Sequence, residues 1–193
     1  MASPTINTAS ASEEAAVLAV LTLAFGADPA TRWTWRTPDE YLRHFPAFAK
    51  IIGGKAFAHE TAFSVDGYAG AALWLPPGVE PDQAELAALM QSSSAAPPED
   101  DAALFEQMER CHPREPHWYL PLIGVDPSHQ GEGLGAALMA HALIACDRDH
   151  TPAYLESSNP KNVPLYERHG FEILGTLQVG TSPPIIPMLR QPQ

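Results

Sequence analysis

The sequence has 193 residues, of which 45% are hydrophobic, so we expect a single domain with a buried core over residues 1–193. Eleven Lys and Arg stand against 23 Asp and Glu, and the formal net charge of −12 argues against nucleic acid and an anionic membrane as partners. Cys111 and Cys146 lack metal-ligand spacing, so we expect two free thiols in a reducing cytoplasm and no metal site.

Residues 1–9 are predicted to form a disordered lead. Ser10 or Ser12 can cap a helix that follows and runs to about Phe25. The lead carries no basic residue, and the apolar run 15–27 is too short to span a membrane. We therefore expect neither a signal peptide nor a membrane anchor, and we place the protein in the cytoplasm.

Gly26–Arg36 is predicted to be a loop, and it contains Trp33 and Trp35. Tryptophan in a loop is costly unless the ring packs or binds something. Two interpretations remain open: the rings close the edge of the core, or they form an aromatic wall of a substrate pocket.

Thr37–Glu40 is a strong helix start, with Thr37 as cap, Pro38 in the first turn and Glu40 completing a capping box. This helix should end at Gly53–Gly54. Its apolar stripe comprises Tyr41, Phe45, Phe48 and Ile52.

The rest of the chain alternates between predicted strands and helices. Strands are expected at 55–65, 68–75, 118–125, 153–157, 171–177 and 185–189. Helices are expected at 81–90, 102–111, 133–148 and 162–168, with a loop at 92–101. The first two strands should form a hairpin about Asp66-Gly67. Gly124 interrupts the strand 118–125, which suggests a bulge or a close approach of backbone or ligand.

A Gly-rich turn lies between that strand and the helix 133–148. After Val125 comes a turn at Asp126-Pro127, and then Gln130-Gly-Glu-Gly-Leu-Gly135 opens the helix. The first N–H groups of a helix lack partners and point out of its positive end, which favours a phosphate. The spacing fits neither the P-loop nor the dinucleotide-binding fingerprint.

The pattern Gln130-x-x-Gly133-x-Gly135 resembles the pyrophosphate-binding loop of the GNAT acetyltransferase superfamily. The segment Tyr154–Phe171 resembles a second GNAT motif, in which a strand, an Asn-containing turn and a Leu-Tyr-Glu helix lead to Gly-Phe. The two matches occur in the expected order over roughly the last 75 residues. The resemblance implies an α/β fold, with a mixed central sheet of six or seven strands, flanking helices and a splayed central strand pair.

A closer resemblance, to the puromycin N-acetyltransferase family, is carried by six segments. These are Ala27–Arg32, Pro113–Pro116, Trp118–Leu120, Val125–Gly131, Leu155–Ser158 and Asn162–Arg168. That family acetylates the amine of an amino-nucleoside antibiotic. The acceptor side of this chain differs, so the resemblance does not extend to the substrate.

The GNAT resemblance implies a set of residues that bind acetyl-CoA. Backbone groups of Ile123, Gly124 and Val125 should pair with the pantetheine arm, and one N–H there can hold the thioester oxygen. The pyrophosphate would be held by Gly131, Glu132, Gly133, Leu134, Gly135 and Ala136, with Gln130 capping or bracing the turn. Asn159, or Asn162 if the turn is shifted, should contact the pantetheine. Glu132 departs from the family pattern, in which a basic residue is common.

The same resemblance assigns catalytic roles to two residues. Tyr166 should hydrogen-bond to the leaving thiolate, with the alternative that it packs its ring and leaves its hydroxyl wet. Glu156 is the candidate base, directly or through water, with the alternative of a carboxylate that braces a turn. His112, His117 and His129 are treated as surface or turn histidines unless the structure places one in the cleft.

The expected function is transfer of an acetyl group from acetyl-CoA to a primary amine of a small molecule. A peptide or protein N-acetyltransferase and a non-catalytic acyl-CoA sensor are the alternatives. Relatives often dimerise, and the sequence leaves the oligomeric state open.

Overall fold

The computed structural model describes residues 4–193. Seven strands form one sheet in the order β1-β2-β3-β4-β5-β7-β6. The strands are β1 Ile6–Thr8, β2 Ala62–Val65, β3 Gly70–Leu75, β4 Trp118–Val125, β5 Ala153–Ser157, β6 Glu172–Ile173 and β7 Ile186–Arg190. Only the β4–β5 pair is parallel among the ladders of this sheet. The predicted mixed sheet flanked by helices is confirmed.

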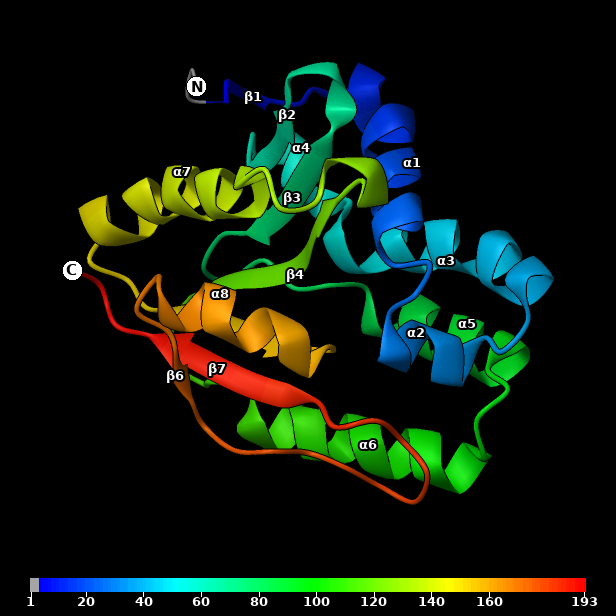
Figure 1. Ribbon diagram of the computed structural model, residues 1–193. Coiled ribbons are helices and arrows are strands. Elements are labelled where there is room, and N and C mark those ends of the chain that lie inside the picture. Colours follow the sequence, from blue (N-terminus) through cyan, green and yellow to red (C-terminus); the bar gives the residue numbers. More distant parts are fainter. Residues whose placement is uncertain (1–3) are drawn as a thin grey trace.

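Helices cover both faces of the sheet (Figure 1). They are α1 Glu14–Ala24, α2 Pro29–Thr34, α3 Pro38–Gly53, α4 Lys55–Ala58, α5 Gln83–Ser93, α6 Pro98–Cys111, α7 Leu134–Arg148 and α8 Val163–Glu167. Ala71, Leu73 and Leu75 of β3 pack with α1, α3 and α5 on one face. Ala72 and Trp74 pack with α7 on the opposite face. This alternation along β3 is the period-two pattern of a strand that is buried on both sides.

The predicted helix starts at residues 10–14 and 37–40 are confirmed. Ser10 forms a capping box with Glu13 across a short 3₁₀ turn, and α1 continues from Glu14. Thr37 forms a second capping box with Glu40 at the start of α3. These caps satisfy orphan N–H groups, so the local sequence determines where each helix begins.

Four predictions about local structure need correction. The disordered lead is wrong for residues 6–8, which form the edge strand β1 on β2, while residues 1–3 lie outside the described residues. The loop Gly26–Arg36 contains helix α2, capped by Asp28. The strand 55–65 is wrong over its first part, where Gly54 stays in the right-handed helical region and α4 follows. The closing strands are shorter than predicted, and outside them Leu177 and Ile185 form a single bridge.

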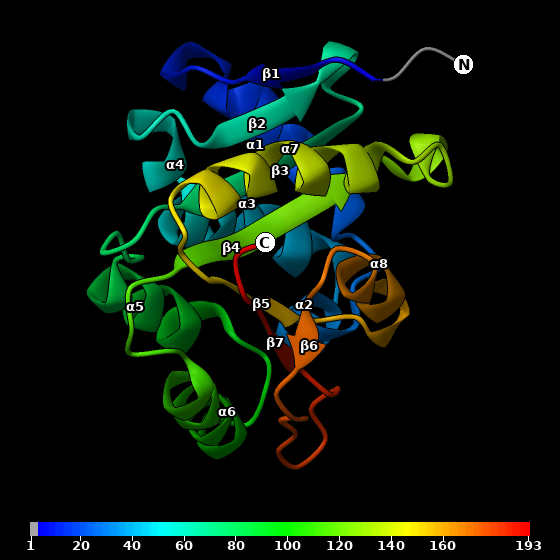
Figure 2. The ribbon, with the colours of Figure 1, turned by 90° about the vertical axis from the view of Figure 1, so that its left-hand side faces the viewer.

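The sheet splits between β4 and β5. These strands pair only from Trp118–Ala153 to Leu120–Leu155, and the pairing ends one residue before Pro121, which has no N–H to donate. At the same place β4 is bulged against β3, because Leu75 pairs with Tyr119 but Leu73 pairs with Leu122. Figure 2 shows β1 to β4 as one group and β5, β7 and β6 as another. The splayed strand pair implied by the family resemblance is therefore present.

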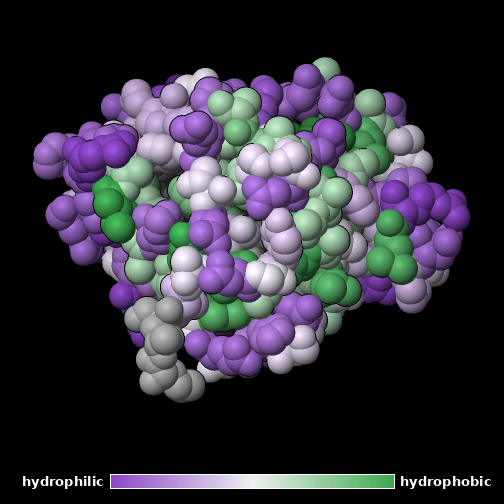
Figure 3. Space-filling view, turned by 90° about the horizontal axis from the view of Figure 1, so that it is seen from above, coloured by the Kyte–Doolittle hydropathy of each residue, from purple (hydrophilic) through white to green (hydrophobic). Residues whose placement is uncertain are grey.

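On the face seen from above in Figure 3, apolar groups are separated by hydrophilic ones. Within residues 4–193, no helix combines the length and the apolar character needed to cross a bilayer.

Gly124 is required by helix packing. A Cβ at this position would lie 2.5 Å from the Ala24 Cβ and 3.3 Å from Leu21 Cδ2, so α1 packs directly on the β4 backbone. The close approach suggested by the sequence is therefore that of α1, and this side of Gly124 has no room for a ligand.

We predict that Gly124→Ala lowers the free energy of unfolding by about 1–3 kcal/mol, because an extra methyl group forces α1 away from β4. Gly175→Ala is the matched control, since a Cβ there meets no atom within 4 Å. Urea denaturation measures both. Equal midpoints for the two variants would contradict the packing argument.

Candidate active site

The gap between the splayed strands is lined by residues from β4, β5 and α8 and from the segments that follow α1 and β5. The lining residues are Phe25, Leu120, Pro121, Ile123, Leu155, Glu156, Ser158, Asn162 and Tyr166. The cleft has a volume of about 30 Å³, so in this structure it is narrow. It contains two ionisable side chains, Glu156 and Tyr166, which are the two predicted catalytic residues.

Tyr166 comes from α8 and is 5% exposed. Its ring packs edge-on against Phe171 at 6.3 Å between centroids. In the described part of the chain no group hydrogen-bonds to the hydroxyl, and Tyr166 lines the cleft. Burial raises the pKa of Tyr166 well above its ordinary value, and the negative charge of Asp28 adds to this. The hydroxyl therefore stays protonated at neutral pH and can donate into the cleft.

Glu156 lies near the end of β5, and its side chain is 7% exposed. The Tyr119 hydroxyl donates a hydrogen bond of 2.8 Å to Glu156 Oε2. His112 Nδ1 lies 3.6 Å from Glu156 Oε1. Burial and the nearby carboxylate raise the pKa of Tyr119, so this hydroxyl remains a donor. The carboxylate is thus held by Tyr119 of β4 and by His112, which follows α6, rather than by a turn.

The Gly-rich turn leads directly into α7. Gly133 is the N-cap, with φ of 81°, and Gly131 has φ of 84°. An added Cβ at either glycine would meet nothing within 4 Å, so the turn is open to the outside. No side chain from residues 4–193 caps the first turn of α7. The N–H groups of Leu134, Gly135 and Ala136 are thus available to an anion, as the sequence predicts for a phosphate site.

A family model described as acetyltransferase (GNAT) domain matches residues 100–173, the stretch that carries β4, the turn, α7, β5 and α8. An uncharacterized N-acetyltransferase of Schizosaccharomyces pombe is 26% identical over 199 residues, covering 91% of this chain and 78% of that protein. Among solved structures, a histone acetyltransferase HPA2 and related acetyltransferase from Corynebacterium glutamicum is 26% identical with a TM-score of 0.71, covering 100% and 98% of the two chains. Residues 100–173 of this chain therefore form a GNAT acetyltransferase domain.

The Drosophila melanogaster polyamine N-acetyltransferase shares the fold, with a TM-score of 0.68 at 13% identity, covering 98% of this chain and 100% of that chain. The family uses acetyl-CoA, and the open turn and the unpaired stretch of β4 fit such a molecule.

The other predicted cofactor residues lie around this cleft in different ways. Ile123 and Asn162 line it, whereas the Asn159 side chain accepts from Lys161 N within its own turn. The fallback residue Asn162 is therefore the better placed of the two.

The turn before α7 is braced differently from the prediction. Gln130 forms no side-chain hydrogen bond within residues 4–193, and Asp126 instead accepts from Ser128 N and Oγ. Glu132 is 55% exposed and lies 3.4 Å from His129, so its carboxylate points toward solvent.

The two tryptophans do not line the cleft. Trp35 is 1% exposed, packs against Phe45 and Phe48, and donates to Ser93 Oγ at 3.1 Å. It takes the packing role of the two that the sequence left open. The indole of Trp33 donates to Thr181 Oγ1 at 3.2 Å and packs with the segment after β6.

Asp28 is a site residue that sequence reasoning missed. It is 6% exposed, its Oδ1 caps α2 by accepting from Ala30 N and Thr31 N, and its Oδ2 accepts from Ser158 Oγ at 2.7 Å. Asp28 thereby ties α2 to the residue that follows β5 at the cleft. The pair Asp28-Pro29 could have indicated the start of α2, because a capping residue followed by proline is common where a helix begins.

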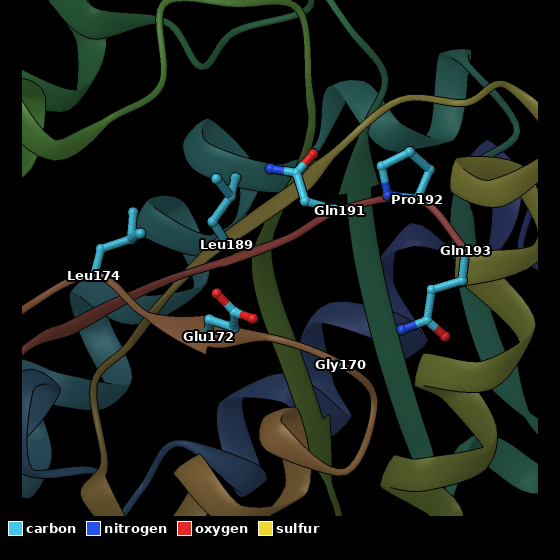
Figure 4. Close-up of a pocket in the computed structure, with 7 residues that line it drawn as sticks. All are labelled: Gly170, Glu172, Leu174, Leu189, Gln191, Pro192 and Gln193. Atoms are coloured by element: carbon cyan, nitrogen blue, oxygen red, sulfur yellow. The ribbon is translucent and has the colours of Figure 1, made fainter.

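Two further features lie apart from this chemistry. A wider hollow of about 180 Å³ is lined by Gly170, Glu172, Leu174, Leu189, Gln191, Pro192 and Gln193 (Figure 4). Glu172 is its only ionisable side chain, so the hollow offers no acid–base pair. Cys111 and Cys146 are free thiols, and residues 4–193 hold no cluster of three side chains suited to a metal ion.

We predict that Asp28→Ala lowers the free energy of unfolding by about 1–2 kcal/mol, because the α2 cap is lost. Asp28→Asn keeps an oxygen that accepts hydrogen bonds, so it should change the free energy of unfolding by only a few tenths of a kcal/mol. Asp82→Ala, which removes the exposed cap of α5, is the matched control for capping alone.

The same variants test the charge of Asp28. Burial raises its pKa in the folded state, so above the ordinary value of about 3.9 the native protein binds more protons than the unfolded chain. Stability relative to Asp28→Asn should therefore rise as pH falls from 7 toward 4.5. Parallel urea curves at both pH values measure the difference, and a pH-independent difference would refute the assignment.

Proposed function

We propose that this GNAT acetyltransferase moves an acetyl group from acetyl-CoA to a primary amine of a small molecule, by direct attack in a ternary complex. The observation that supports this most is that Glu156 and Tyr166 line one cleft at the splay of β4 and β5. The narrow gap favours holding amine and thioester together, which can lower the barrier by about 7–11 kcal/mol.

The cofactor would be held mainly by backbone groups. We assign the pyrophosphate to the turn 131–136 and the pantetheine to the edge of β4 at 123–125, with Asn162 beside it. One N–H of this edge would stabilise the thioester oxygen as it gains charge. Since the chain has a net charge of −12, the positive potential has to come from the α7 dipole and the uncapped N–H groups.

Glu156 would remove a proton from the acceptor. An ammonium has no lone pair, and a lysine-type amine has a pKa of about 10.4 while an α-amine is near 7.7–8.0. Help from a base therefore matters most for the more basic amines. The Glu156 carboxylate has lone pairs beyond those that Tyr119 and His112 face, so it can accept this proton directly or through water.

Tyr166 would stabilise the leaving thiolate by a hydrogen bond. A thiol has a pKa of about 8.5 and tyrosine about 10, so full transfer of the tyrosine proton is uphill by roughly 2 kcal/mol before burial is considered. Burial raises the pKa of Tyr166 further, which increases that cost. A donated hydrogen bond is therefore the role that its environment favours.

A peptide or protein N-acetyltransferase is the second candidate. It is favoured by the full-length likeness to the Corynebacterium glutamicum protein and by the acidic balance of the chain, which would attract a basic peptide. The likeness to the Drosophila melanogaster polyamine enzyme favours a small amine instead.

A panel assay decides among these. Thiol release from acetyl-CoA is measured with polyamines, arylalkylamines, an amino-nucleoside and basic peptides. Release with small amines supports the proposal, and release with peptides alone supports the second candidate. Calorimetric binding of acetyl-CoA with no release by any amine would leave a non-catalytic sensor as the function.

We predict that Tyr166→Phe lowers kcat by about 10- to 100-fold with little change in the Kd of CoA, because the ring remains and only the donor is lost. Phe171→Leu, which disturbs the packing of the same ring, is the control. A Tyr166→Phe variant as active as the wild type would remove the assignment.

We further predict that Glu132→Lys lowers the Kd of CoA about three- to tenfold at low salt, since a cation replaces an anion beside the pyrophosphate turn. The gain should disappear near 1 M salt, where the Debye length is about 3 Å. Glu85→Lys makes the same charge change on α5, outside the turn, and should have little effect. Equal gains from both variants would show only a global charge effect.

A further inference from the structure

Two histidines that the sequence left as surface residues form a row that leads to Glu156. His112 follows α6, and its Nδ1 faces Glu156 Oε1 at 3.6 Å. His112 Nε2 lies 2.9 Å from Nε2 of His117, which precedes β4. His117 Nδ1 lies 2.8 Å from the carbonyl oxygen of Glu115. The side chains form a continuous row from the cleft carboxylate to partly exposed rings.

The hydrogen bonds determine which nitrogen carries each proton. A carbonyl oxygen only accepts, so His117 Nδ1 donates to Glu115. Burial lowers the pKa of His117, with the adjacent His112 also contributing, and the neutral ring then accepts at Nε2. His112 Nε2 must donate this bond, which leaves its Nδ1 lone pair directed at Glu156.

The surroundings leave few other routes for a proton from Glu156. Tyr119 occupies Oε2 as a donor and cannot take a proton there. The Tyr154 ring packs edge-on against His112 at 4.8 Å and against His117 at 5.8 Å. Burial and the nearby Glu156 carboxylate raise the pKa of Tyr154, so its hydroxyl keeps its proton and cannot take one from Glu156. The His112 side chain is 31% exposed, so it reaches solvent while Glu156 does not.

The titratable groups around His112 come from several elements. Glu156 and Tyr154 belong to β5, Tyr119 to β4, His117 to the residues before β4, and Cys111 to the end of α6. Glu80, in the loop after β3, adds a more distant negative charge near His117. Among these groups, the carboxylate that faces His112 is that of Glu156.

We propose that His112 carries the proton that Glu156 takes from the acceptor amine to solvent, and that His117 positions His112 for this by fixing its tautomer. This rests on the proposed function, because it needs Glu156 to act as the base. Acetylation of an ammonium releases one proton: the amine N–H breaks, a bond to Glu156 oxygen forms, and the proton then moves to His112 Nδ1. The imidazolium loses a proton to water, and Glu156 returns to the carboxylate. The separation of 3.6 Å requires a small approach of the ring or one bridging water.

We predict that His112→Ala lowers kcat about 100-fold near neutral pH, in line with the usual effect of losing a proton-transfer group. The acid limb of the pH profile should move, because the group that passes the proton on from Glu156 is lost. Added imidazole should restore at least about a tenth of the lost rate. His112→Asn is the milder companion variant, and His59→Ala, at an exposed histidine after α4, is the control.

Two further measurements separate a relay from a structural role. In a Glu156→Gln background, His112→Ala should lower kcat little further, because the two residues act in the same proton transfer. His117→Ala should lower kcat about three- to tenfold with the Kd of CoA unchanged. A His112→Ala variant with an unmoved acid limb, or one that imidazole does not rescue, would overturn the relay while leaving acetyl transfer in place.

A readout without turnover keeps the two proposals distinguishable. Nitrogen NMR of the histidine rings in the free enzyme reports which nitrogen of His112 carries the proton, and the signal of Nδ1, which faces Glu156, should change in Glu156→Gln. An unchanged Nδ1 signal would refute the pairing even in an active enzyme. If no amine is acetylated by the wild type, the proposed function fails, and this measurement still decides whether His112 shares a proton with Glu156.

Discussion

The parting of β4 and β5 is the constraint on which the rest of the site depends. A proline and a bulge occur at the same place in β4, so the ladder to β5 stops at Leu120 while the ladder to β3 continues. In a complete sheet, the neighbouring strands supply hydrogen-bond partners for the backbone groups on both edges of a buried strand. The stretch 121–125 therefore keeps an unpaired edge toward β5, and an extended ligand can occupy it in the way a strand would.

Electrostatics impose a second constraint, because an acidic protein has to bind a polyanion. The chain places no basic side chain in the turn before α7 and instead leaves the first helical N–H groups uncapped. Side chains of Asp28, Thr37 and Asp82 cap α2, α3 and α5. The uncapped N–H groups at the start of α7 lie beside an open Gly-rich turn, where an anion can reach them.

Local signals in the sequence predict most of the elements but not the environment of each side chain. Capping boxes locate α1 and α3, and β4 and β5 match their predicted bounds, because these signals act within a few residues. The strand β1 was missed because its partner β2 lies more than fifty residues away. The helix α4 was missed because Gly54 adopts a helical conformation where a glycine usually ends one. Trp35 is in the core, and His112 meets Glu156, through tertiary contacts that no spacing encodes.

The alternation of side chains along β5 explains why both partners of the reaction have to meet in the gap. Leu155 packs with Tyr166, α7 and α8 on one face, while Tyr154 and Glu156 point to the other face, toward Tyr119 and His112. Glu156 and Tyr166 thus lie on opposite faces of the sheet, and a complete β4–β5 ladder would separate them. An amine approaching from the α6 side and a thioester lying along α7 and α8 can touch only where the ladder is open. This geometry favours direct transfer over an acylated enzyme, because neither residue has to carry the acetyl group across the sheet.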